Sequence, residues 1–160
     1  MAIRFDDLFD VDLAATMTYS AQEAAEHCTC AFCRNFYAAL DRYTPEVRPF
    51  LAWFGVDAEA PDHMIPELCD DGFVGYQPEY MVFGKMRGNT SIEIMVGNTR
   101  ALFEKTGEGT DRFVITLLDL KFPWVMDEPM DETEFPFAGI PLVERSLERY
   151  HSDLSDEKTS

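Results

Sequence analysis

The sequence predicts an α+β fold in which N-terminal helices pack on one face of an antiparallel sheet. Apolar residues repeat at helical spacing before residue 56, whereas short apolar runs separated by turn residues follow from residue 72 onwards. The 160 residues, of which 46% are hydrophobic, suit one hydrophobic core. We therefore expect a single α+β domain over residues 1–150 and a flexible acidic tail over residues 151–160.

The first elements are predicted from an alternation and a capping motif. Apolar side chains recur at every second position over residues 11–19, which is typical of a half-buried strand. Ser20 and Glu23 have the spacing of a capping box, which marks the start of a helix. The sequence therefore predicts a strand over residues 11–19 and then a short helix over residues 21–27.

Two main helices are predicted next. Residues 29–43 place apolar side chains on one stripe, and residues 45–54 place them at positions i, i+3, i+4 and i+7. Pro45 suits the first position of the second helix, and Gly55 suits its end. The apolar residues are Phe32, Phe36, Leu40 and Tyr43 in the first helix and Val47, Phe50, Leu51 and Phe54 in the second.

The middle of the chain is predicted to change from an acidic connection into sheet. Residues 57–72 contain several acids and two prolines, and we expect at most one turn of helix there, near residues 64–68. Residues 80–83 and 92–96 flank a Gly-Asn turn cluster and predict a hairpin. If the apolar edge at residues 80–83 were exposed, it would allow a homodimer.

The last elements are predicted from apolar runs. Residues 99–106 fit either a short helix or a strand. Residues 112–118 are largely apolar on both faces, which indicates a central strand covered by helices on at least one side. Residues 122–126 fit a neighbouring strand that Pro123 confines to an edge or bulge, and residues 142–150 fit a short amphipathic helix.

The net charge of −17 disfavours some classes of partner. Residues 57–80 contain seven acids and no base, and residues 127–160 contain ten acids and three bases. Because affinity for phosphate groups comes from Lys and Arg, we expect neither nucleic acid nor an anionic membrane to bind. The charge allows a protein partner of unknown identity, for example a basic one.

The sequence predicts a cytoplasmic protein with reduced thiols. No apolar run of about 18 residues is present, so no membrane-spanning segment is expected. The first seven residues include one arginine and two acids and lack the apolar core of a signal peptide. Three of the four cysteines lie within six residues, unlike the spread framework of small secreted proteins.

The segment His27-Cys28-Thr29-Cys30-Ala31-Phe32-Cys33 is the densest group of metal-binding side chains. Structural zinc sites use four thiolate or imidazole ligands in a tetrahedron. A Cys-x-x-Cys pair at a helix start directs two sulfurs to one point, and a bend at Thr29 would add the third. The predicted zinc ligands are Cys28, Cys30, Cys33 and Cys69, with His27 or His63 as substitutes.

Two other interpretations of these cysteines stay open. Unpaired N–H groups at a helix N-terminus acidify a thiol, so Cys30 and Cys33 could be the attacking and resolving thiols of a thiol-disulfide redox enzyme. Alternatively, the cysteines are ordinary buried or half-buried thiols. Phosphate-loop, Gly-x-Ser-x-Gly and His-Glu-x-x-His motifs are absent from the sequence. The leading hypothesis is therefore a small non-enzymatic interaction or accessory protein. Its cofactor is either zinc, held by the cysteine cluster, or none.

Two polar residues follow the last thiol directly. On the predicted helix Arg34 points away from the apolar stripe, and it could pair with an acid on another element. Asn35 could cap a neighbouring backbone segment. Ordinary exposure would explain both residues equally well.

The chain contains two motifs that lie far apart in the sequence. They are Cys30-Ala31-Phe32-Cys33-Arg34-Asn35-Phe36 and Leu120-Lys121-Phe122-Pro123-Trp124-Val125. With Phe54-Gly55-Val56-Asp57, they make the chain resemble a group of small uncharacterised bacterial proteins that carry a Cys-x-x-Cys-Arg-Asn-Phe motif and a later Pro-Trp strand. The resemblance brings no known activity. It implies a bacterial intracellular protein in which the thiol pair and the Pro-Trp strand belong together.

Overall fold

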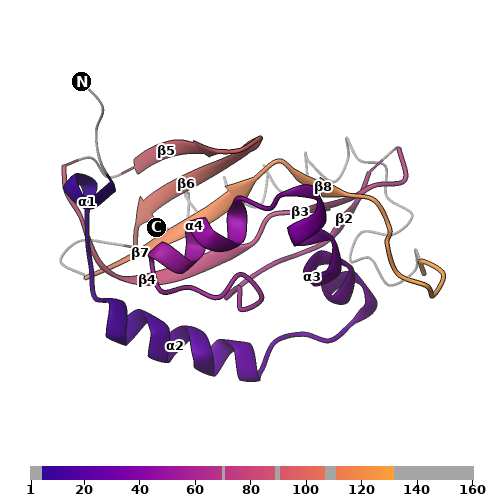
Figure 1. Cartoon of the computed structure of the whole chain (residues 1–160), viewed down its shortest axis with the longest axis horizontal. Coiled ribbons are helices and arrows are strands. Elements are labelled where there is room, and N and C mark those ends of the chain that lie inside the picture. Colours follow the sequence, from indigo (N-terminus) through magenta and orange to yellow (C-terminus); the bar gives the residue numbers. More distant parts are fainter. Residues whose placement is uncertain (1–4, 70, 89–90, 107–110, 132–160) are drawn as a thin grey trace, which may run out of the picture.

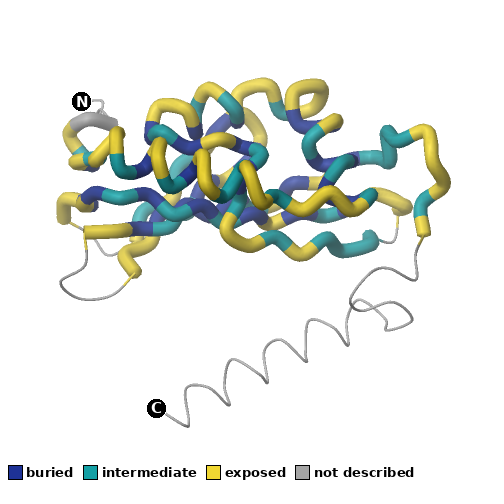
Figure 2. The backbone as a smooth tube through the Cα atoms, turned by 90° about the horizontal axis from the view of Figure 1, so that it is seen from below, coloured by how far each residue is buried: buried dark blue, intermediate teal, exposed yellow. Residues whose placement is uncertain are grey.

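The computed structural model describes residues 5–69, 71–88, 91–106 and 111–131, and it shows the predicted α+β fold. Helices lie on one side of a curled antiparallel sheet, and buried residues gather between the two layers (Figure 1; Figure 2). The helices are α1 Phe5–Leu8, α2 Leu13–Ala25, α3 Ala31–Tyr43 and α4 Val47–Trp53. The strands are β1 Phe9–Val11, β2 Glu67–Leu68, β3 Val74–Tyr76, β4 Glu79–Met86, β5 Ser91–Val96, β6 Thr99–Lys105, β7 Arg112–Leu118 and β8 Leu120–Phe122.

Two antiparallel sheets make up the strand layer. The larger sheet has the order β1-β4-β7-β6-β5, and the smaller one has the order β2-β3-β8. Strand β7 lies between β4 and β6, so the prediction of a central strand over residues 112–118 is confirmed. Both layers contribute fully buried aromatic side chains to the core, among them Phe36, Phe54, Tyr80, Phe103 and Phe113.

The predicted hairpin between residues 80–83 and 92–96 is wrong, because β4 and β5 are not neighbours in the sheet. Strand β4 pairs with β1 and β7, whereas β5 forms a hairpin with β6. The two-residue turn Gly97-Asn98 closes this hairpin, with glycine at a φ of 60°. Residues 99–106, which fitted a helix or a strand, therefore contain a strand.

Residues 11–19 do not form the predicted strand. Helix α2 covers Leu13–Ala25, so the short helix expected over residues 21–27 is the end of a longer one. The Asp12 carboxylate caps this helix by accepting a hydrogen bond from the N–H of Ala15 at 3.1 Å. The alternation suggested a strand, but Ala, Leu and Met are also strong helix formers, and the Asp12 cap favours the helix.

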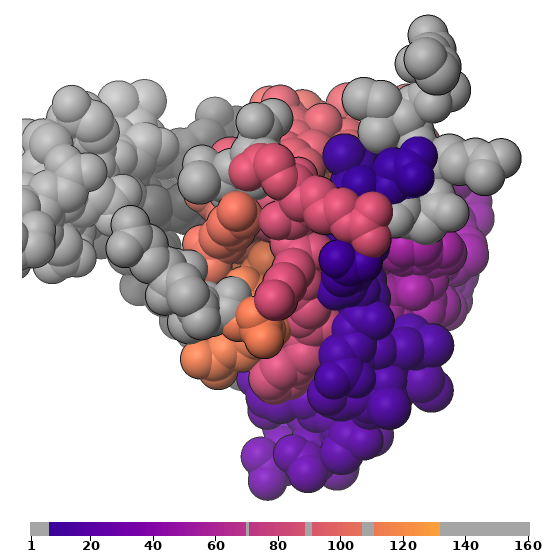
Figure 3. Space-filling model, turned by 90° about the vertical axis from the view of Figure 1, so that its left-hand side faces the viewer, coloured from indigo at the N-terminus to yellow at the C-terminus, as the bar shows by residue number. Residues whose placement is uncertain are grey.

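The start of α2 covers part of the edge of β4 over residues 80–83, the edge that would allow a homodimer if it were exposed. The N–H of Asp12 donates to the carbonyl of Phe83 at 2.8 Å, and Thr16 Oγ1 accepts from the N–H of Phe83 at 3.0 Å. Further along the strand, Asp62 Oδ2 accepts from the N–H of Met81 at 2.6 Å. Groups of the same chain therefore bind the backbone along this edge. Figure 3 shows the N-terminal segment, in indigo, lying against the pink strand segment.

The two main helices lie where they were predicted, with later starts. Helix α3 begins two residues inside the expected range of 29–43. Helix α4 begins two residues inside the range of 45–54, because the N–H of Val47 bonds the carbonyl of Thr44 in a turn before the helix. Their apolar stripes face the sheet, so the prediction of helices packed on one face is confirmed.

Other expectations differ in detail. The turn of helix near residues 64–68 is wrong, since β2 lies there, and the proline in this stretch has no N–H for a helical turn. The strand expected over residues 122–126 is β8, which starts earlier and ends where Pro123 cannot continue the ladder. The helix expected over residues 142–150 and the tail over 151–160 lie outside the described residues.

Gly84 permits the close approach of β1 to β4. Its φ is 148°, and an added Cβ would lie 2.2 Å from the carbonyl oxygen of Asp10. We expect Gly84→Ala to lower the free energy of unfolding by about 2 kcal/mol, because the added Cβ clashes with the backbone of Asp10 and Val11. Urea denaturation measures the loss. Gly88→Ala is the matched control, since Gly88 also has a positive φ but open space around it. Equal losses in the two variants would contradict the close approach.

Candidate metal centre

The three cysteines of the predicted cluster lie together at the start of α3. Their sulfur atoms all lie within 4.8 Å of one another. Cys30 is the N-cap residue and Cys33 lies in the first turn, so both side chains share one face of the helix. The chain bends before the helix, and the N–H of Cys30 donates to Sγ of Cys28 at 3.4 Å. The prediction that a bend near Thr29 adds a third sulfur is confirmed.

The thiols differ in their surroundings. Cys28 and Cys30 are exposed, whereas only 6% of the Cys33 surface is exposed. The hydrogen bond from the N–H of Cys30 lowers the pKa of the Cys28 thiol. Burial, reinforced by the neighbouring thiols, raises the pKa of the Cys33 thiol. Of these two, Cys28 is the readier to ionise, and a bound cation would have to displace the proton of Cys33.

A cavity of about 300 Å³ opens beside the thiols. Cys28, Cys33, His27 and His63 all line it, so the structure places both candidate histidines near the cluster, although neither is among the group within 4.8 Å. None of the described residues that line this cavity is Lys or Arg. Three carboxylates also line it, from Glu23, Glu26 and Asp62. This surrounding charge favours a cation over an anion.

His27 is held in one orientation. Its Nδ1 lies 3.3 Å from the carbonyl oxygen of Glu59, and its ring stacks on that of Tyr37 with 4.9 Å between centroids. The Tyr37 hydroxyl also donates to the carbonyl of Cys28 at 2.9 Å. When Nδ1 donates to Glu59, Nε2 is the nitrogen left for a ligand. This support could not be predicted from local sequence patterns, because Glu59 lies 32 residues away from His27.

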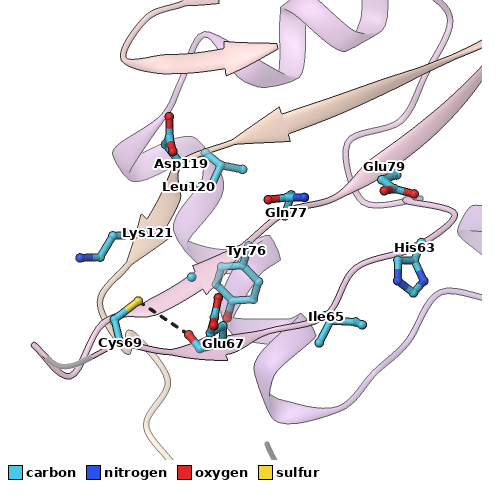
Figure 4. Close-up of a pocket in the computed structure, with 11 residues that line it drawn as sticks. His63, Ile65, Glu67, Cys69, Tyr76, Gln77, Glu79, Asp119, Leu120 and Lys121 are labelled. Carbon is cyan, nitrogen blue, oxygen red and sulfur yellow. Dashed lines mark hydrogen bonds between the residues drawn. The ribbon is translucent and has the colours of Figure 1, made fainter. Parts of the chain in front are cut away.

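Cys69, predicted as the fourth zinc ligand, lies elsewhere. It follows β2, and its thiol faces the carbonyl of Glu67 at 3.8 Å. It lines another cavity, of about 430 Å³, and Figure 4 shows it at the opposite end of that cavity from His63. Cys69 is not among the sulfurs within 4.8 Å of one another, so the structure does not bring the four cysteines together.

The polar residues after the last thiol fasten α3 to the Pro-Trp segment. Arg34 forms an ion pair with Glu128 at 2.5 Å. Asn35, fully buried, accepts a hydrogen bond from the N–H of Val125 at 2.7 Å and donates to the carbonyl of Pro123 at 3.2 Å. An acid partner for Arg34 and a capped backbone segment for Asn35 are both confirmed.

Asn35 also donates to the hydroxyl of Tyr76 at 3.2 Å. We expect Asn35→Ala to lower the free energy of unfolding by about 2 kcal/mol, because it leaves the partly buried N–H of Val125 without its acceptor. Urea denaturation measures the change. Gln22→Ala, an exposed amide on α2, is the control and should change the stability little. An Asn35→Ala protein as stable as the wild type would show that the amide does not hold the segment.

No family model, curated protein or solved structure matches this chain. Among the helices within the described ranges, none combines the length and the hydropathy that crossing a bilayer requires.

Proposed function

We propose that this chain is a small interaction or accessory protein whose thiol cluster holds a structural zinc ion. The observation that carries the proposal is that the sulfurs of Cys28, Cys30 and Cys33 converge within 4.8 Å at a helix start. Zinc favours thiolate ligands, and structural zinc sites are closed by four protein ligands. A closed site leaves no coordination position for a substrate, which favours a non-enzymatic role.

We infer that His27 supplies the fourth ligand. A metal-bound histidine usually donates its other ring N–H to a carbonyl or a carboxylate. His27 is arranged in this way, since its Nδ1 faces the carbonyl of Glu59. It also precedes Cys28 in the chain and lines the same cavity. The connection between α2 and α3 would have to adjust on metal binding to bring Nε2 to the sulfurs.

His63 is the less suitable histidine. It lines the same cavity, but its carbonyl accepts a hydrogen bond from the N–H of Glu79 at 2.9 Å at the start of β4. The bridge to β4 restrains the backbone on both sides of His63, whereas the backbone bond of His27, to the carbonyl of Ala24, is longer, at 3.4 Å. Residues 28–30 are exposed and lie outside the helices, so this segment is the part that can adjust.

Zinc would stabilise the connection between α2 and α3 by joining it to the start of α3. Ligands on the connection and on the first turn of α3 would be joined through one ion, and the free energy of metal binding would add to that of folding.

Protein purified without chelators is expected to contain one zinc ion per chain by elemental analysis. We expect Cys33→Ser to lose the ion, because a buried thiolate ligand is removed. We expect His27→Ala to keep it with an affinity at least about tenfold lower, because a weaker ligand such as water replaces the imidazole. Competition with a chromophoric chelator measures the affinity.

Cys69→Ser and His63→Ala are the controls and should bind zinc like the wild type. Cobalt substitution gives an independent measurement, since its visible spectrum differs between ligand sets of three sulfurs with one nitrogen and of four sulfurs. Zinc near zero in the reduced wild-type protein would remove the metal from the proposal.

The alternative function is a thiol-disulfide redox enzyme that uses Cys30 and Cys33. The proximity of the two sulfurs favours it as well, since a modest shift would allow a disulfide bond of about 2.0 Å. Exposed Cys30 would attack and buried Cys33 would resolve. This alternative predicts that mild oxidation links the two residues reversibly and that Cys30→Ser abolishes turnover of a disulfide substrate. Full zinc occupancy without such turnover would decide against it.

A further inference from the structure

Helix α2 is inverted compared with an ordinary surface helix, because polar residues face inward and apolar residues face solvent. Its buried residues are Thr16 and Ser20, whereas Leu13 and Met17 are 47% and 55% exposed. The buried hydroxyls bond backbone groups: Thr16 bonds β4, and Ser20 accepts from the N–H of Asp57 at 2.8 Å. An apolar helix face turned to solvent is a candidate contact surface.

A groove of about 340 Å³ runs between α2 and the end of α4. Leu13, Met17 and Ala21, each four residues apart, line one side, and Ala52 and Gly55 line the other. Gly55 has a φ of 83°, and a Cβ there would lie 2.9 Å from Cδ1 of Leu13 and 3.0 Å from Cγ of Met17. The absence of a side chain at Gly55 therefore lets Leu13 and Met17 approach the end of α4 closely and sets the floor of the groove. Its volume is at the lower end of the range for ligand pockets, about 300–1,000 Å³, which suits a few apolar side chains.

One acidic residue lines the groove, and a second lies at the start of its helix. Asp57 lines the groove and Asp12 caps α2, whereas Glu23, the one charged residue within the helix, lines the cavity beside the thiols. Arg48 lies 3.9 Å from Asp57, but it is shared with other carboxylates, including Asp41 at 2.9 Å. The whole chain carries a net charge of −17, so the field around the apolar groove is negative.

We propose that this groove binds a basic amphipathic helix of a partner protein. Apolar side chains at positions i, i+3 or i+4, and i+7 of that helix would enter the groove, and flanking Lys or Arg residues would face the acids. The proposal rests on the accessory role proposed above, though not on the zinc ion. Charge selects this occupant, since a second copy of the chain would bring like charges together and nucleic acid would be repelled.

The probe is a fluorescein-labelled synthetic helix of about 18 residues built from Leu and Lys, with Leu at helical spacing on one face. Fluorescence anisotropy at about 0.15 M salt measures its affinity for the full chain. We expect Met17→Glu to weaken binding at least about tenfold, a loss typical of a central apolar contact. Met95→Glu is the matched control, because Met95 is 60% exposed on β5 and outside the groove.

The two variants add the same negative charge, so they separate the groove from simple charge attraction. If charge alone bound the basic peptide, both variants would bind at least as tightly as the wild type, and the proposal would be overturned. Failure of the wild-type chain to bind would also overturn it. Leu13→Glu, a second variant on the same wall, should weaken binding like Met17→Glu, and circular dichroism checks that each variant is folded.

Zinc content measured on the same samples separates this proposal from the metal site. A zinc-free chain that binds the peptide and loses binding on Met17→Glu would support the groove and remove the zinc ion. A zinc-loaded chain that does not bind the peptide would overturn the proposal for the groove and leave that for the metal site unaffected.

Discussion

The arrangement around the thiols depends on the buried carboxamide of Asn35. It bonds the hydroxyl of Tyr76 on β3 and the backbone on both sides of Trp124, so three segments far apart in the sequence meet at one side chain. Buried amide groups retain their hydrogen bonds because losing one costs the full desolvation of its partner. The start of α3 therefore has one position relative to the small sheet. The convergence of the sulfurs is a local consequence of this anchored helix start.

A second constraint is the edge of β4, whose backbone groups need partners. Asp12, Thr16 and Asp62 supply them, and this fixes which side of α2 faces inward. Because the inward side must bond a strand edge, it carries hydroxyls. The apolar residues of the same helix are then left on the outer side. The groove beside α4 is therefore a consequence of how α2 supplies hydrogen bonds to the backbone at the edge of β4.

The sequence predicted those features whose signals are local. The stripes of α3 and α4, the two-sided apolar run of β7 and the spacing of Cys30 and Cys33 each need a few neighbouring residues to be read. The prediction of a strand over residues 11–19 was wrong because the residues that alternate there are also strong helix formers. The hairpin failed because strand order depends on contacts between distant segments. The ligands beyond the three thiols stayed open for the same reason, since the carbonyl that orients His27 belongs to Glu59.

The ligands of the proposed metal site lie beyond the end of α2, whereas residues within α2 line the proposed groove, so the two are energetically separable. Zinc would act beyond the end of the helix, through the connection that carries His27 and Cys28, and would reduce the freedom of that connection. The groove depends on the first half of the helix, which is fixed by the Asp12 cap and by the bonds of Thr16 and Ser20. Mutational effects at sites without shared partners usually add. Loss of the ion would therefore lower the stability of the whole domain without reshaping the contact surface.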